Sequence, residues 1–263
     1  MTPILAFDIE TVPDVAGYRA LNGLDAAPSD AALSDTDVAE MAYTRRRAQT
    51  GNDFLQPHLQ RVVAISCALR EGDHFRVWSL GSPEDGEAEL IRRFYDGIER
   101  YTPTLVSWNG SGFDLPVLHY RSLVHGLSAP RYWDMGEDDR EFKFNNYINR
   151  YHSRHTDLMD LLALFNGRNS VPLDALAQLC GFPGKLGMDG SRVWQAYQDG
   201  EIANIRNYCE TDSANTFLLF LRFQLLRGAY DEARYRREIE LVRTTLGKSG
   251  AAHWREFLDA WRA

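Results

Sequence analysis

Hydrophobic and polar positions alternate between strand-like and helix-like periods along the first half of the chain. Residues 3–9 form a short, mostly apolar run that predicts a buried strand. Residues 61–80 contain two β-rich runs on either side of a Glu-Gly-Asp turn, which predicts a hairpin. Residues 83–101 carry apolar side chains at helical spacing, and residues 104–110 form a second short apolar strand that ends in Asn-Gly.

The second half of the chain is mainly helical in pattern. Helical spacing of apolar side chains resumes over residues 113–127 and over 157–165, and 170–181 reads as a helix that a glycine ends. Residues 191–227 predict one or two further helices. The order of strand, hairpin, helix, strand and then helices predicts an α/β fold, with a mixed β-sheet flanked by helices.

Two segments stand apart from this order. Residues 14–60 have a weak pattern of small and acidic residues, which we interpret as a helical or irregular insertion. Residues 228–263 are rich in Arg and Glu and amphipathic, which predicts a helical C-terminal appendix. A chain of 263 residues is long enough for one large domain. We therefore expect a domain over residues 1–227 followed by the appendix.

Composition excludes several classes of protein. Apolar and charged contents of 44% and 25% are ordinary for a soluble protein, and no apolar run reaches the 18 or so residues of a membrane span. The N-terminus lacks the basic region of a signal peptide, so we expect a cytoplasmic protein. Cys67, Cys180 and Cys209 are far apart, which argues against a disulfide framework or a cysteine zinc site. The net charge of −8 disfavours tight non-specific binding to long duplex DNA.

The first strand carries the first candidate site. Asp8 and Glu10 are two residues apart, so they share one face of the strand while Ile9 points to the other. Two carboxylates so close repel each other unless a cation lies between them, and Mg²⁺ prefers such oxygen ligands. The alternative is a strand end that emerges into solvent.

Two further candidate sites follow. Asp114 comes just after the second apolar strand, where ligand sites form in α/β sheets, although an acid at a helix start also acts as a cap. Tyr208 and Asp212 are four residues apart and share a helical face, but a surface Tyr and Asp would give the same pattern.

Together these three sites carry a resemblance to a known family. FDIET begins at residue 7, NGSGFDLP at residue 109 and YCETD at residue 208. In this combination the chain resembles the DEDD superfamily of 3′–5′ exonucleases, which have a ribonuclease H-like fold, and more narrowly the tyrosine (DEDDy) branch. It looks most like stand-alone bacterial proteins related to the proofreading exonuclease domain of family B DNA polymerases. The resemblance runs from about residue 3 to residue 227.

The resemblance implies a metal-dependent mechanism. Asp8, Glu10, Asp114 and Asp212 would hold two divalent metal ions, Mg²⁺ or Mn²⁺, with Asp8 bridging both. Two such ions activate the attacking water and stabilise the leaving 3′ oxygen. Tyr208 would orient the water, because a phenol with a pKa near 10 is a poor base at neutral pH.

Other residues have weaker assignments. By the resemblance, Asn109 would position the 3′-terminal nucleotide, and Phe113 would stack on a base or pack in the core. Lys185 lies in a glycine-rich loop, where it could neutralise charge near the scissile bond or be solvated. Trp108 is more typical of a core residue, and Asp157 of a helix cap.

The implied function is removal of nucleotides from the 3′ end of single-stranded nucleic acid, with DNA favoured and no membrane partner. Short RNA as substrate, a catalytically inactive nucleic-acid-binding protein and a hydrolase of small phosphoesters are the alternatives. Since the chain is too short for a polymerase domain after residue 228, we expect any proofreading role to be in trans. A second interpretation of the third site uses His152, five residues before Asp157, in place of Tyr208 and Asp212.

Overall fold

The core of the molecule is a five-stranded mixed β-sheet. The computed structural model describes residues 2–24 and 33–262. Within them the strands are β1 Ile4–Pro13, β2 Gln60–Glu71, β3 His74–Ser79, β4 Thr104–Ser107 and β5 His155–Asp157, in the order β3-β2-β1-β4-β5. Strands β1 to β3 are antiparallel neighbours, whereas β4 runs parallel to β1 and to β5. The predicted mixed sheet is confirmed, and it is consistent with a ribonuclease H-like fold.

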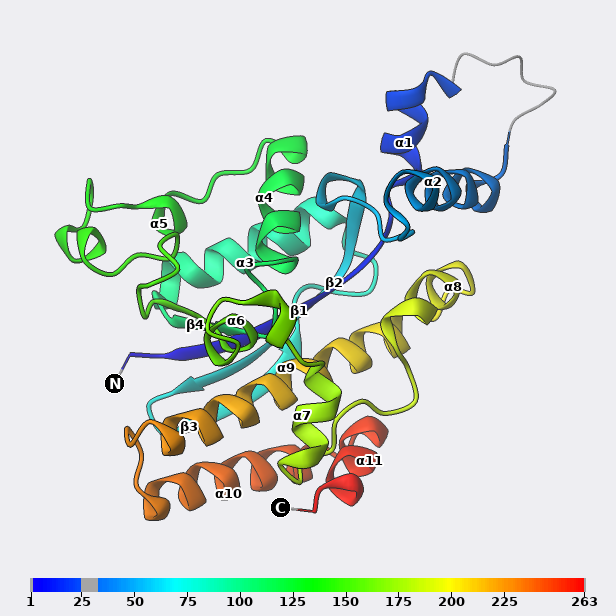
Figure 1. Ribbon diagram of the computed structural model, residues 1–263. Helices are drawn as coiled ribbons and strands as arrows, with labels where there is room; N and C mark the ends of the chain where they lie inside the picture. The colour runs from blue at the N-terminus through cyan, green and yellow to red at the C-terminus, as the bar shows by residue number, and fades with distance from the viewer. Residues whose placement is uncertain (1, 25–32, 263) are drawn as a thin grey trace.

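Helices cover both faces of this sheet (Figure 1). They are α1 Val15–Asn22, α2 Asp35–Thr50, α3 Glu87–Tyr101, α4 Asp114–His125, α5 Pro130–Trp133, α6 Leu158–Leu162, α7 Leu173–Leu179, α8 Val193–Gln198, α9 Ile202–Leu226, α10 Glu232–Ser249 and α11 Ala252–Ala260. Helices α3, α4 and α5 lie on one side, and α7, α9, α10 and α11 on the other. None of the helices in the described part of the chain is long and apolar enough to cross a membrane.

Side chains of β1 alternate between the two layers. Leu5, Phe7 and Ile9 pack in the cluster with α3 and α4, whereas Ile4 and Ala6 pack in the cluster with α9. Because successive strand residues point to opposite faces, the two acids of β1 lie on the α9 side. The shared face predicted for them is confirmed, and buried neighbours on both sides hold the strand in this register.

The structure corrects the position of the acids along the strand. They lie inside β1, which continues to Pro13, and not at its end. The reason is that β2 pairs with β1 as far as Pro13, while the parallel pairing with β4 stops at Ala6. The acids are therefore exposed along one edge only, beyond the last β4 pair.

Two other expectations were incomplete. Strand β5 was not predicted, because three residues beside a polar stretch give no alternating pattern. The helix expected over residues 157–165 is only Leu158–Leu162. Leu164 and Phe165 adopt φ values of 52° and 57°, which end the helical geometry.

The insertion is helical where it is described, in α1 and α2, while residues 25–32 lie outside the described part. A buried guanidinium connects it to the body of the protein. Arg121 of α4 donates to both carboxylate oxygens of Glu87, at 2.8 and 2.6 Å, to Asp14 at 2.5 Å and to the carbonyl of His58 at 3.1 Å. The start of α3, the entry to α1 and the exit of the insertion therefore meet at one ion-pair network.

The C-terminal helices share a core with α9. Val242 and Leu246 of α10 and Trp254 and Phe257 of α11 are buried in the cluster that covers the α9 face of the sheet. The division into a domain over residues 1–227 and an appendix stays a prediction.

Candidate active site

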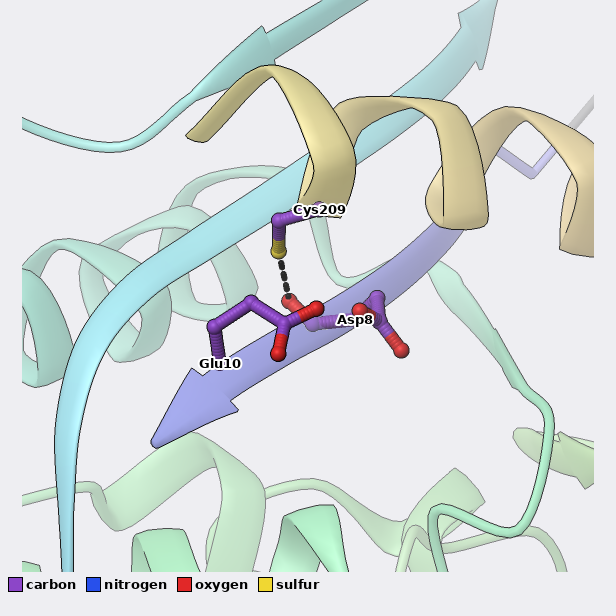
Figure 2. A group of neighbouring side chains, drawn as sticks. All are labelled: Asp8, Glu10 and Cys209. Carbon is purple, nitrogen blue, oxygen red and sulfur yellow. Dashed lines mark hydrogen bonds between the residues drawn. The ribbon is translucent and has the colours of Figure 1, made fainter. Parts of the chain in front are cut away.

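Asp8 and Glu10 lie next to a cysteine of α9. Figure 2 shows the two carboxylates on β1 and the Cys209 side chain reaching down from the helix above them. The Cys209 Sγ and one carboxylate oxygen of each acid lie within 4.8 Å of one another. The thiol donates to the Asp8 carbonyl oxygen at 3.2 Å, and burial raises its pKa well above the usual value. Because the thiol stays protonated and already donates a hydrogen bond, we assign it to packing and not to metal binding.

Asp114 reaches the same region from the start of α4. Its Oδ1 accepts a hydrogen bond from the Ile9 backbone N–H at 3.2 Å. That N–H lies beyond the last β4 pair, so the carboxylate takes the place of a strand partner. The cap position belongs to Phe113, so Asp114 is inside the helix and does not cap it with its side chain.

Helix α9 supplies the third group of residues. Tyr208 and Asp212 are both buried, as expected for residues on one face that packs against the sheet. The Oδ1 of Asp212 is buried and accepts no hydrogen bond within residues 2–24 and 33–262. An unsatisfied, buried carboxylate oxygen is costly, which indicates that this atom normally has a partner from outside the chain.

Lys185 is the cation that lies beside these acids. Its Nζ is 3.9 Å from the Asp212 Oδ2 and 5.3 Å from the centroid of the Tyr208 ring. The loop that carries Lys185 is fixed from below, because its backbone N–H donates to Asp174 at 2.7 Å and the Gly184 N–H donates to Asn215 at 3.2 Å. The lysine is therefore brought into the group that the sequence suggested, and its role stays a prediction.

Crowding of the four acids changes their protonation. Loss of hydration on burial is the largest cause, and it raises the pKa of Asp114 to about 7 and that of Asp212 to about 6. The pKa values of Asp8 and Glu10 rise well above their usual values through the same burial and through the charges of the other acids. Lys185 opposes the rise at Glu10 and at Asp212.

Burial and the same acids also raise the pKa of Tyr208. Its hydroxyl therefore stays protonated at neutral pH and can donate or accept a hydrogen bond, but it cannot serve as a base.

The donor set fits hard divalent cations. Asp8, Glu10, Asp114 and Asp212 offer only carboxylate oxygens, which Mg²⁺ and Mn²⁺ prefer. Their raised pKa values mean that the protein keeps them together at a cost that a bound cation would remove. The unpartnered Asp212 oxygen supplies one free ligand position.

A second carboxylate organises the loop that precedes α4. Asp157 accepts backbone N–H bonds from Asn109 at 3.0 Å and from Ser111 at 2.8 Å, and it also caps α6. The predicted cap is confirmed, but the loop contacts were missed because they join residues about 50 positions apart. Asn109 has a φ of 65°, a conformation that Asn tolerates better than most residues.

The remaining predicted residues lie around this centre. Phe113 packs partly against the α3–α4 core, and its ring lies 5.1 Å from the ring of Phe54 in the insertion. Trp108 packs against the α9 core, as predicted, and its ring N–H donates to the Val171 carbonyl. His152 is held in its loop, where Nδ1 accepts from the Asn146 N–H at 3.0 Å.

Glu210 was expected to be solvated, and the structure shows otherwise. Its carboxylate accepts a hydrogen bond from Ser79 at 2.8 Å and pairs with His253 of α11 at 3.1 Å. The sequence could not reveal this, because the partners come from β3 and from the C-terminal helices.

Comparison with known proteins places this architecture in a family of nucleases. Residues 52–261 match the family described as a predicted 3′-5′ exonuclease related to the exonuclease domain of PolB. The match covers well over half of the chain, so the chain belongs to this family. The expected relation to the exonuclease domain of family B polymerases is thereby confirmed, as is its assignment as a 3′–5′ exonuclease.

Two curated proteins show more limited similarity. The chain is 32% identical over 92 residues to DNA polymerase 1 of Sulfurisphaera ohwakuensis, which covers 35% of this chain and 10% of that protein. It is 44% identical over 45 residues to the catalytic polypeptide of DNA polymerase epsilon from Saccharomyces cerevisiae, which covers 17% of this chain and 2% of that protein. The chain thus matches only a small part of the length of either polymerase.

Proposed function

We propose that the chain removes nucleotides one at a time from the 3′ end of single-stranded DNA, with two divalent ions held by Asp8, Glu10, Asp114 and Asp212. The observation that carries this proposal is the convergence of four buried or partly buried carboxylates from β1, α4 and α9, one of which has an unpartnered oxygen. When bound, Mg²⁺ or Mn²⁺ would lower the pKa of the attacking water and stabilise the charge on the leaving 3′ oxygen.

The residues of the chain provide the geometry for this reaction. Asp8 and Glu10 project from a strand that is paired with β2 along its whole length, so their separation is fixed. Asp114 is held against the same strand by the Ile9 N–H. Such fixed ligands preserve the positions of reacting groups, which is where much of the rate enhancement of an enzyme arises.

Tyr208 and Lys185 have complementary roles in the proposal. The buried, protonated Tyr208 hydroxyl would orient the water by a hydrogen bond. The ammonium of Lys185, on the open side of Asp212, would offset the negative charge that builds up on the phosphate in the transition state. Asp157 would act through the loop that it anchors, which carries Asn109 and leads to Phe113.

The alternative third site is less well supported. All the hydrogen bonds of Asp157 go to backbone N–H groups of the 109–111 loop and of α6, which is a structural role. DNA is favoured over RNA because both curated relatives are DNA polymerases by name.

The test is a nuclease assay on matched single-stranded DNA, RNA and 3′-blocked DNA, each with Mg²⁺, Mn²⁺ or excess EDTA. We expect cleavage of DNA that needs both a metal and a free 3′ end. Faster cleavage of RNA would change the substrate class, and equal cleavage of the 3′-blocked strand would refute attack from the 3′ end.

A further inference from the structure

Beside the four acids, the insertion and α8 enclose a cavity that the mechanism above does not use. It has a volume of about 670 Å³, and Glu10 and Thr11 of β1 form part of its wall. The aromatic rings of Phe54, Phe113 and Trp194 line other parts of it. A cavity of this size lies within the range of sites that hold small organic ligands.

The two phenylalanines form a pair across the edge of this cavity. Phe113 directly precedes Asp114, and Phe54 comes from the end of the insertion. Their ring centroids are 5.1 Å apart with the planes tilted by 57°. Phe54 is 55% exposed, which is unusual for a large apolar side chain, and packing of the core does not explain its position.

The backbone around Phe54 is nevertheless held firmly. Its N–H donates to the Asn52 side chain at 2.8 Å, and its carbonyl accepts from Arg46 at 3.1 Å. The neighbouring Leu55 is buried, and its carbonyl accepts from Gln60, whose side-chain oxygen in turn accepts from the Thr11 hydroxyl at 2.9 Å. These bonds connect an exposed aromatic ring to the residue that follows Glu10, so the ring is preorganised relative to the acids.

The charges around the cavity indicate which part of a nucleotide it would take. Glu10, Glu40 and Asp53 line it together with Arg47, whose guanidinium is 2.5 Å from the Asp53 carboxylate. A surface with this excess of negative charge repels phosphate but not a neutral base. Aromatic faces bind any base by stacking, provided that the base is unpaired.

We propose that Phe54 is a base-stacking residue that the insertion supplies to the exonuclease site. In this proposal, which rests on the proposed function, a base from the last two nucleotides of a single strand enters the cavity and stacks on Phe54 beside Phe113. The phosphates stay outside, toward the acids and Lys185. The insertion would thereby select unpaired 3′ ends, since a base within a duplex cannot leave its stack without an energetic penalty.

The test compares Phe54→Ala and Phe54→Tyr with Phe144→Ala, a control in which an exposed phenylalanine away from the cavity is removed. In steady-state assays with Mn²⁺ on single-stranded DNA, Phe54→Ala should raise KM by roughly 5-fold or more, the loss of one base–aromatic stack. The value of kcat should change little, and Phe54→Tyr and Phe144→Ala should resemble the wild type.

A second readout does not depend on cleavage. Strands with 2-aminopurine at the first, second or tenth position from the 3′ end, joined by cleavage-resistant phosphorothioate linkages, report stacking as quenching of fluorescence. The wild type should quench one of the first two positions more than the tenth, and Phe54→Ala should remove that difference. If the wild type cleaves DNA but Phe54→Ala keeps its KM and its quenching, the stacking role is wrong while the exonuclease proposal stands. If the wild type quenches the terminal base but does not cleave, the exonuclease proposal fails and the stacking role stands.

Discussion

Replacement of Asp212 by Asn should stabilise the metal-free protein at alkaline pH. Burial raises the pKa of Asp212 from 3.8 to about 6, so its charged form is unfavourable in the folded state. The rise of about 2 units corresponds to about 3 kcal/mol, at about 1.4 kcal/mol per unit. Asn has nearly the shape of the neutral acid, and at pH 8 it would remove this penalty. For a chain of this size we expect the melting temperature to rise by roughly 6–12 °C.

The pH dependence gives the prediction a sign that is easy to check. Since the folded-state pKa of Asp212 lies above the unfolded value, the folded protein binds more protons, and stability falls as pH rises from about 4 through about 6. Asp114 extends the same loss of stability to about pH 7. Wild-type and Asp212→Asn proteins should therefore melt at similar temperatures at pH 4 and differ most at pH 8.

The assay is a series of thermal melts in EDTA between pH 4 and pH 8, repeated with saturating Mn²⁺. Metal at 100 times its Kd should stabilise the wild type by about 2.7 kcal/mol, and it should stabilise Asp212→Asn less. Asp73→Asn, in the exposed turn between β2 and β3, is the matched control and should change stability by less than about 0.5 kcal/mol. A lower melting temperature for Asp212→Asn in EDTA at pH 8 would refute the reasoning, because the carboxylate would then be stabilised by its protein contacts.

Two further predictions concern the water-orienting residue and the ion-pair network of the insertion. Tyr208→Phe should lose roughly 10-fold or more in kcat under saturating Mn²⁺, the effect of one positioned hydrogen bond, while His152→Ala should lose little; the opposite order would favour the alternative third site. Arg121→Met should lower the free energy of unfolding by about 3–5 kcal/mol in denaturant titrations, because it leaves the buried Glu87 carboxylate without its bidentate partner. An effect below about 1 kcal/mol would show that water or another group replaces the guanidinium.

Periodicity and local motifs carry much of the fold. The hairpin, α3, α4, α9 and the shared face of Asp8 and Glu10 follow from patterns that depend only on neighbouring residues. Strand β5 does not, since its three residues become a strand only because β4 lies beside them. The true end of β1 was missed for the same reason, as it is set by pairing with β2.

The candidate site shows the same division. The four acids, Tyr208 and Lys185 could be proposed from motifs, and the structure brings them together. The partners that hold them could not: the Ile9 N–H that orients Asp114, and Asp157 beneath the 109–111 loop, are distant in sequence. Phe54 carries no motif of its own, and only its position against Phe113 suggests its role.

The most direct test of the central claim follows a 5′-labelled single-stranded DNA in time, with Mn²⁺, for the wild type and for Asp8→Asn. We predict that the wild type produces a ladder that shortens by one nucleotide at a time from the 3′ end. Asp8→Asn should fold, as its melting curve would show, and produce no ladder above the EDTA control. Internal cleavage of the strand, or an undiminished ladder from Asp8→Asn, would contradict the assignment of this site as a metal-dependent 3′–5′ exonuclease centre.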